Sequence, residues 1–244
     1  MLAPRELRVR YRQSLLDVTW ALINPVVILA VYGFILTQSF DVRSACAPYL
    51  SSAWAGLVVW MFFATAVGTA VTSLVSSSDL ITKVYFPREA IPASITLASA
   101  ADLLVGMGIL VVLVLVQGVA LSPWALAALL PLAVVLVWSA AIAILTSVIA
   151  AFVRDTIHAV GLALRVGFFA TPVMYEASVL PSQVRWAADV NPVAASIEGV
   201  RSSLLCGTAP SWSLLLIHLG VGMAVLLAAV SYTKAVETRI ADVL

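Results

Sequence analysis

Long apolar runs separated by short polar segments dominate this chain. A helix needs about 20 mostly apolar residues to cross a hydrocarbon core of roughly 30 Å, and six windows meet that requirement. They are 18–37, 54–75, 91–116, 124–152, 158–174 and 214–232. The runs are continuously apolar and do not alternate with polar residues, which excludes the strands of a membrane β-barrel. The pattern predicts an all-α protein with six transmembrane helices, of which the fifth is short and contains Arg165.

Composition agrees with a polytopic membrane protein. Hydrophobic residues make up 63% and charged residues 10% of the 244 residues, whereas a soluble domain is about half apolar and a quarter charged. So few charges could not cover the surface of a soluble protein. No polar stretch is long enough to fold separately, so we expect a single membrane domain over residues 1–244. The net charge of +1 argues against nucleic-acid binding.

The placement of basic residues predicts the orientation. An even number of spans puts both termini on one side, and that side would carry nine of the 13 Lys and Arg residues. The other side would carry Arg43, Arg185 and Arg201, and Arg165 lies within the fifth span. Because cytoplasmic loops hold the excess of Lys and Arg, we expect both termini and residues 76–90 to face the cytoplasm.

The segment "SSSDLITKVYFPREAIP" at 76–92 is polar, yet it contains two aromatic residues. Its serines and Asp79 supply capping side chains for a helix start, and Pro87 would end that helix. Tyr85 and Phe86 are too apolar for a solvated loop that has nothing to pack against. The pattern predicts a short cytoplasmic helix that buries these rings against another molecule.

Two other segments favour amphipathic helices, each with an alternative. The segment "PRELRVRYRQSLLD" places apolar and basic residues on different helical faces, which suits a helix in the cytoplasmic headgroup layer; a plain positive-inside anchor is the alternative. Within 175–212, apolar residues recur at helical spacing on both sides of Asn191–Pro192. This favours two short external helices that dip into the outer leaflet or cap a pore; a connector without a transport role is the alternative.

Asp102 and Arg165 are the charged residues at membrane depth. At about 1.5 Å per residue, Asp102 lies roughly 16 Å and Arg165 roughly 13 Å from the cytoplasmic starts of their spans. Intramembrane charges usually pair or face a cavity, so an ion pair between them is geometrically possible. It would be either a structural clamp or a contact for substrate. The spans hold no further acidic or histidine residue at depth, which argues against a proton relay.

Aromatic residues in the spans, among them Trp60, Phe168 and Phe169, admit two interpretations. They could line a path on which sugar rings pack, or they could fill the interior of the helix bundle.

Cys46 and Cys206 both fall on the predicted external side, and they do not have a metal-ligand spacing. An oxidising compartment would permit a disulfide between them; two scattered free thiols are the alternative.

Motifs for chemistry are absent from the sequence. There is no GxxxxGK[ST] phosphate loop, no HExxH and no His/Cys cluster. No serine lies in GxSxG. We therefore expect no catalytic residue, no metal site and no cofactor in this chain.

Four motifs in chain order make the sequence resemble a known family. They are "RVRYRQSLLDVTWALINPVV" (8–27), "KVYFPREAIP" (83–92), "FFATPVMY" (168–175) and "NPVAASIEGVRSSLL" (191–205). Together they resemble the membrane subunit of ABC-2 type polysaccharide exporters, the permeases that export O-antigens, teichoic acids or related lipid-linked glycans. The resemblance runs over nearly the whole chain.

The resemblance implies an assembly and a location. Two copies of the chain would join two copies of a separate nucleotide-binding subunit, which would bind ATP and Mg²⁺. The substrate would be a glycan on a polyprenyl pyrophosphate or similar carrier, moved through a tunnel between the two copies. The protein would lie in the bacterial inner membrane with both termini in the cytoplasm. An ABC-2 exporter of a drug or small lipid, and an ion-coupled secondary transporter, are the alternatives.

The resemblance also implies roles for particular segments. An interface helix maps to residues 4–16, a coupling helix to 77–88 and two external gate helices to 178–205. The segment before the first span is short for this family, so either the interface helix is clipped or the start lies upstream. Arg165 departs from the family pattern, in which an apolar or neutral residue is expected.

The candidate site residues then fall into four groups. The coupling group is Asp79, Lys83, Tyr85, Phe86, Pro87 and Arg88; the carrier-pyrophosphate group is Arg5, Arg8, Arg10 and Arg12; the tunnel or intramembrane group is Asp102, Arg165, Trp60, Phe168, Phe169 and Tyr175; and the external gate group is Trp186, Asn191, Pro192, Glu198 and Arg201.

Overall fold

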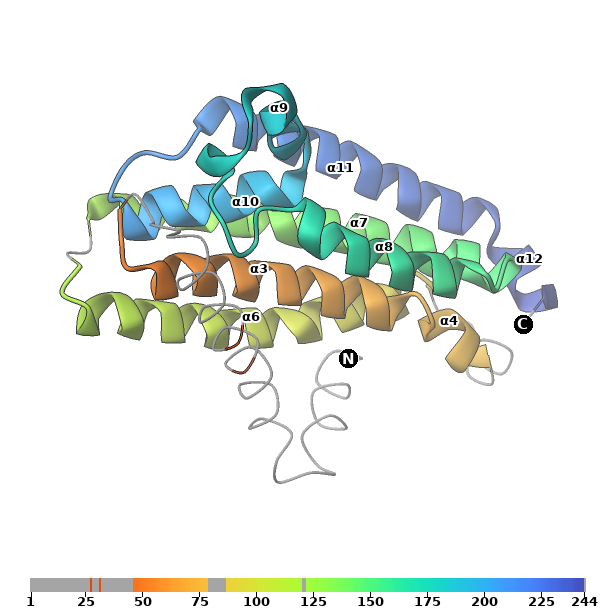
Figure 1. Ribbon diagram of the computed structural model, residues 1–244. Helices are drawn as coiled ribbons and strands as arrows, with labels where there is room; N and C mark the ends of the chain where they lie inside the picture. The colour runs from red at the N-terminus through yellow and green to blue at the C-terminus, as the bar shows by residue number, and fades with distance from the viewer. Residues whose placement is uncertain (1–26, 28–30, 32–45, 79–86, 120–121, 244) are drawn as a thin grey trace.

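A computed structural model describes residues 27, 31, 46–78, 87–119 and 122–243 of the chain (Figure 1). Within these residues the fold is entirely helical. The long helices are α3 (Tyr49–Ala70), α6 (Ala90–Val116), α7 (Leu129–Phe152), α8 (Thr156–Ala170) and α11 (Trp212–Ala235). The short ones are α4 (Ser73–Ser76), η1 (Pro123–Ala128), η2 (Ala177–Val179), α9 (Ser182–Val190), α10 (Pro192–Val200), the π-helical turn η3 (Arg201–Leu205) and α12 (Glu237–Val243).

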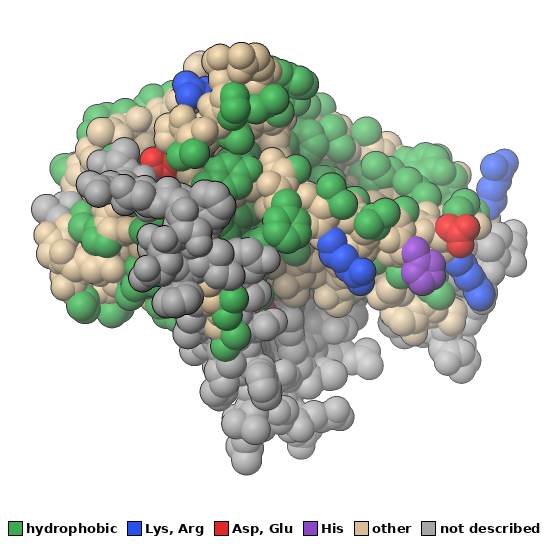
Figure 2. All heavy atoms as spheres, viewed as in Figure 1, with side chains coloured by type: hydrophobic (Ala, Val, Ile, Leu, Met, Phe, Trp, Pro, Cys, Tyr) green, Lys and Arg blue, Asp and Glu red, His purple; other side chains and the backbone are tan. Residues whose placement is uncertain are grey.

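The long helices run side by side along one direction, and the short helices gather at the two ends of the bundle (Figure 1). One end, here the α9 end, holds α9, α10, η3 and the starts of α3, α7 and α11. The other, the α12 end, holds α4, α12 and the starts of α6 and α8. The viewed face is mostly hydrophobic or uncharged; acidic, basic and histidine side chains lie close together near the α12 end, and other charged side chains appear near the middle and towards the α9 end (Figure 2).

Four helices are long and apolar enough to cross a membrane: Tyr49–Ala70, Ala90–Val116, Pro123–Phe152 and Trp212–Ala235. They match the second, third, fourth and sixth spans predicted from the sequence. The fifth predicted span, 158–174, forms only the 15-residue helix α8. It ends at Ala170 because Thr171 takes an extended backbone conformation directly before Pro172, and a residue that precedes proline is disfavoured in the α region. The first predicted span lies outside the described residues apart from Val27 and Val31, so the described residues contain four candidate spans where six spans were predicted for the whole chain.

Helix α3 forms the centre of the bundle. It packs against α6, α7, α8 and α10, and most of its residues are buried. It begins at Tyr49, earlier than the predicted residue 54, with Pro48 directly before its first turn. The larger cluster of buried apolar side chains is built around α3 and includes Leu57, Val59 and Phe62.

Glycines let the long helices approach one another closely, as small residues do between membrane helices. A Cβ at Gly106 of α6 would lie 2.6 Å from Val58 of α3, and one at Gly222 of α11 would lie 2.7 Å from Trp138 of α7. The same contacts are hydrogen-bonded, since Trp54 Nε1 donates to Gly106 O at 3.0 Å and Trp138 Nε1 donates to His218 O at 2.9 Å. The helices are therefore held by matched small and large residues.

Candidate functional site

The external gate candidates and Tyr175 lie at the α9 end, around the break between α9 and α10. Asn191 caps α10, because its Oδ1 accepts from the backbone N–H groups of Val193 at 3.0 Å and Ala194 at 3.3 Å. Pro192 occupies the first turn, where it costs no hydrogen bond. The Asn191 Nδ2 donates to Thr171 Oγ1 at 2.9 Å. The capping residue of α10 is thus also tied to the segment that follows α8.

Arg201, in the π-helical turn after α10, is the most heavily bonded side chain in this region. Only 3% of its surface is exposed. Its guanidinium donates to the side chain of Glu198 at 2.9 Å and to four backbone carbonyls, which come from α3 and from the segment after α8. The carbonyls are those of Ser52 (3.1 Å), Pro172 (2.9 Å), Val173 (2.7 Å) and Tyr175 (2.9 Å).

The Arg201 cluster, meaning Arg201 with these partners, joins three parts of the chain that are far apart in sequence. An arginine stays charged in proteins, and burial without partners would be costly. Here burial lowers the pKa of Arg201 from its ordinary value, while the negative charge of Glu198 opposes that shift. The carbonyls of a non-helical segment also need donors when they are buried. The cluster satisfies both requirements at once.

The segment 171–175 passes very close to α3 at Gly56. A Cβ at position 56 would overlap the carbonyl oxygen of Val173 and lie 2.8 Å from Arg201 Nη2. Tyr49 Oη, two turns of α3 earlier, donates to Met174 O at 2.9 Å. Glycine at this position therefore allows the polar backbone of 171–175 to lie against the central helix.

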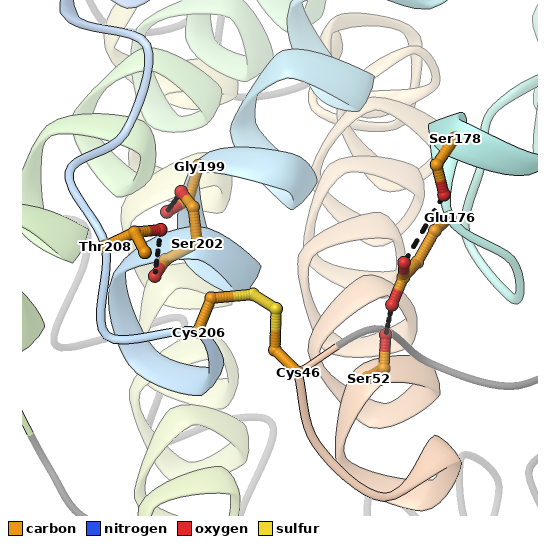
Figure 3. The surroundings of a disulfide bond; sticks show 8 residues. All are labelled: Cys46, Ser52, Glu176, Ser178, Gly199, Ser202, Cys206 and Thr208. Carbon is orange, nitrogen blue, oxygen red and sulfur yellow. Dashed lines mark hydrogen bonds between the residues drawn. A yellow bond between two sulfur atoms is a disulfide. The ribbon is translucent and has the colours of Figure 1, made fainter.

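A disulfide between Cys46 and Cys206 closes the same region (Figure 3). It connects the residues just before α3 to the end of η3, across 160 positions of sequence. Figure 3 also shows Glu176, which accepts from Ser52 Oγ at 3.5 Å and from Ser178 Oγ at 3.4 Å. Of the two alternatives for these cysteines, the bonded one is confirmed.

Helices α9 and α10 differ in how they are held. Seven of the nine residues of α10 are buried, whereas only Ala188 of α9 is buried. Arg185 donates to Ser178 O at 2.9 Å, and His218 contacts Asp189 O at 2.8 Å, so α9 is attached mainly near its ends. A cavity of about 220 Å³ lies beneath it, lined by Ala188, Asp189, Glu198, Ser202, Leu214 and other residues. Trp186 of α9 is exposed.

The aromatic candidates form a chain of contacts from α3 to the surface of α8. The ring centroids of Trp60 and Phe168 lie 6.1 Å apart, and those of Phe168 and Phe169 lie 5.3 Å apart. Trp60 is buried, whereas 64% of Phe169 is exposed. Tyr175 Oη donates to Phe169 O at 3.2 Å, and burial raises the pKa of Tyr175. Among these aromatic residues, buried Trp60 thus fills the interior of the bundle, whereas Phe169 lies on the surface.

The two intramembrane charges are not brought together. Asp102 is half-buried on α6, and Arg165 is exposed on α8. In the described part of the chain, Glu198–Arg201 is the ion pair, and none joins Asp102 to Arg165. The two helices pack on α3 and α7 and make no extensive contact with each other. The clamp between the third and fifth spans is therefore not formed in this structure.

Most of the coupling and carrier candidates lie outside the described residues. These are Asp79, Lys83, Tyr85, Phe86, Arg5, Arg8, Arg10 and Arg12, together with the interface helix 4–16 and most of the coupling helix 77–88. Pro87 is exposed, and Arg88 is buried with its Nη1 atom lacking a hydrogen-bond partner.

Ser52 of the Arg201 cluster and the neighbouring Gly56 were not singled out from the sequence, and Thr171 was only part of the motif at 168–175. Ser52 takes part chiefly through its backbone carbonyl. The available signals were a glycine within an apolar span and the Glu198–Arg201 spacing of three residues, which places both side chains on one helical face.

Comparison with known proteins agrees with this architecture. Residues 1–205 match the family described as "ABC-2 type transporter". The chain is a membrane protein of the ABC-2 type transporter family, as its motifs indicated.

Its relatives include three proteins named "O-antigen export system permease protein RfbA". The one from Klebsiella pneumoniae is 28% identical over 207 residues, 84% of this chain and 78% of that protein. The one from Myxococcus xanthus is 30% identical over 186 residues, 75% of this chain and 69% of that protein. A second Klebsiella pneumoniae protein of that name is 26% identical over 206 residues, 83% of this chain and 78% of that protein.

Proposed function

We propose that this chain is the membrane subunit of an ATP-driven exporter that moves a lipid-linked polysaccharide of the O-antigen class out of the cytoplasm. The observation that carries the proposal is its similarity to O-antigen export permeases over most of both chains. The absence of a phosphate-binding loop from the sequence fits a transport subunit whose ATP and Mg²⁺ are bound by a separate partner. Two copies of the chain and two of the ATPase complete the proposed assembly, with the tunnel between the two copies.

In this proposal the α9 end faces the outside and the α12 end faces the cytoplasm. The described basic residues at the α12 end, Arg88, Arg154, Lys234 and Arg239, outnumber Arg185 and Arg201 at the α9 end, which fits the positive-inside rule. The disulfide supports the same orientation independently, because disulfides persist in oxidising compartments. Helices α9 and α10 then act as the external gate, with Trp186 on its exposed surface.

The segment 77–88 would transmit the closure of the ATPase to the membrane subunit. Tyr85 and Phe86 would fill a groove on the ATPase, with Asp79, Lys83 and Arg88 in ion pairs at its rim. Arg88 is buried in the single chain, so its side chain would have to turn outward to take part in such a pair. The basic residues of the interface helix would gather the carrier pyrophosphate at the inner headgroup layer.

Deletion of the gene tests the proposal. We expect surface O-antigen to disappear from the cells, with glycan accumulating on its carrier inside, and to return when the wild-type gene is supplied. Unchanged surface glycan combined with altered drug sensitivity would assign the chain to a different class of ABC-2 exporter. Transport that continues when every candidate ATPase partner is inactivated would favour an ion-coupled transporter.

A further inference from the structure

The exposed face of α8 carries a charge in the middle of an apolar helix. Leu162, Val166 and Phe169 are exposed on this face, and Arg165 lies among them. The opposite face packs on α3, where a Cβ at Gly167 would lie 2.9 Å from Trp60 and one at Gly68 would lie 3.4 Å from Leu164. The close approach of the two helices directs Arg165 away from the bundle interior.

Arg165 is deep in its helix and has no partner in the described residues. It lies about 14 Å from the start of α8 and about 8 Å from its end, at 1.5 Å per residue. No hydrogen bond or ion pair joins it to any residue that the structure describes. An arginine facing lipid at the centre of a helix would cost about 2.5–3.5 kcal/mol or more. This cost argues against a lipid environment for this face.

The exposed face of α6 provides the contrast. Its exposed large side chains are Leu97, Leu104, Val105, Val112, Leu115 and Val116. All of them are apolar, as expected for a surface in contact with lipid tails. The exposed face of α8 thus differs from that of α6 by a positive charge, and within a membrane such a charge requires water or a negative group beside it.

The chemistry of the side chain indicates which group would fit. The guanidinium presents parallel N–H donors that match the paired oxygens of a phosphate or a carboxylate. Phe169 lies one helical turn from Arg165 on the same face. Its ring contacts Phe168, which in turn contacts buried Trp60, so the apolar surface at Phe169 is continuous with the core. A charged donor beside a well-packed apolar surface suits an anionic group that is carried on a larger molecule.

We propose that this face of α8 borders a water-filled path across the membrane and that Arg165 binds an anionic group, a phosphate or a carboxylate, of the molecule in transit. The inference rests on the proposed function in that it requires a transported molecule. It adds that this molecule is negatively charged where it passes α8. The phosphate could belong to a lipid carrier, and the carboxylate to an acidic sugar.

The first experiment measures water access in the complete transporter, with its ATPase partner, in membrane vesicles. The chain has two cysteines and both are in the disulfide, so a single introduced thiol reports its own position. Val166→Cys on α8 is compared with Leu104→Cys on α6, using methanethiosulfonate reagents that carry a sulfonate or a trimethylammonium group. We expect Val166→Cys to react at least about tenfold faster than Leu104→Cys with either reagent, since both the reagents and the reactive thiolate are charged and are disfavoured in lipid.

The same thiol measures the charge of the path. With Arg165 present, the sulfonate reagent should be favoured over the trimethylammonium reagent, and Arg165→Gln should reduce that preference several-fold, whereas Arg165→Lys should retain most of it. Equal rates at positions 166 and 104 would overturn the water-filled path. A reagent preference that Arg165→Gln leaves unchanged would overturn the anion site.

The second experiment identifies the source of the anion. The transporter with Val166→Cys is placed in phosphatidylcholine vesicles with or without a polyprenyl pyrophosphate, or is exposed to sodium glucuronate. Protection of the thiol by the pyrophosphate lipid assigns the site to a carrier, and protection by glucuronate assigns it to an acidic sugar. Protection by neither overturns binding at Arg165. These readouts do not depend on surface O-antigen, so they distinguish failure of this inference from failure of the proposed function.

Discussion

At the scale of single residues, Gly56 and Arg201 show how a polar segment is accommodated inside an apolar bundle. The segment 171–175 brings backbone carbonyls against α3, and Arg201 supplies the donors for them. Gly56 provides the room, because any side chain there would meet the carbonyl of Val173. Both residues act through contacts with backbone atoms, which cannot be removed by changing a neighbouring side chain.

Replacement of Gly56 by alanine should destabilise the protein. The new methyl group would push against backbone oxygen, and overpacking of this kind costs about 1–3 kcal/mol. The measurement is the apparent melting temperature of detergent-purified protein by size-exclusion chromatography after heating. Gly108→Ala is the matched control, since a Cβ there would meet nothing within 4 Å. Equal melting temperatures for the two variants would contradict the close packing at Gly56.

Replacement of Arg201 by methionine should be more severe. The change keeps an unbranched side chain, although a shorter one, and leaves four carbonyls and Glu198 without their shared donor. Breaking a buried charged network costs about 3–5 kcal/mol, so we expect little folded protein at growth temperature. Arg185→Met, on the exposed surface of α9, should change the yield slightly. A normal yield and melting temperature for R201M would show that the carbonyls find other partners.

At the scale of elements, α9 and α10 are two short helices of equal length with different surroundings. The buried helix α10 is capped by Asn191 and continued by the turn that holds Arg201 and Cys206. Helix α9 lies over a cavity and is largely exposed. If this region gates a path, α9 is the helix that can move at low cost, because few packing contacts would have to break.

Hydrogen exchange measures this difference directly. Amides of 193–205 should exchange much more slowly than those of 183–190 when the purified protein is analysed by exchange and mass spectrometry. Reduction of the Cys46–Cys206 bond should accelerate exchange in η3 and have less effect on α9. Uniform protection across 183–205 would mean that the two helices move as one body.

A second expectation at this scale concerns the coupling segment 77–88. Phe86→Ala should weaken co-purification with the ATPase or leave ATP hydrolysis uncoupled from export, because an aromatic anchor in a groove carries much of the binding energy of an interface. The measurements are the recovery of ATPase in a pull-down and the amount of surface glycan. Trp186→Ala, at the opposite end, should leave co-purification intact. Export and co-purification at wild-type levels in F86A would remove this role.

At the scale of the whole molecule, some features of the fold could be predicted from the sequence and others could not. Four spans could be read from apolar runs, because a helix that crosses lipid must hide its backbone and present apolar side chains throughout. The early end of α8 could not be predicted in this way. The apolar run of the sequence continues through Thr171 and Pro172, whereas the backbone leaves the helical conformation at Thr171.

The contacts of the Arg201 cluster could not be predicted from the sequence either. Its contact with Ser52 spans 149 positions and those with 172–175 span 26 to 29, and all of them end on backbone carbonyls that every residue possesses. The proline break at Asn191–Pro192 was visible, because capping and proline chemistry act over neighbouring residues. The pairing of the two cysteines was one of two alternatives until the fold brought them together.

The Cys46–Cys206 bond also has a consequence for biosynthesis. Cys46 leaves the ribosome before α3, whereas Cys206 follows α3, α6, α7 and α8. The first thiol must therefore wait, reduced or shielded by an oxidoreductase, while four helices are inserted. In a cell, the age at which nascent copies become resistant to thiol alkylation would mark the moment when the α9 end of the bundle closes. Formation of the bond thus provides a measurable marker for a late stage of membrane insertion.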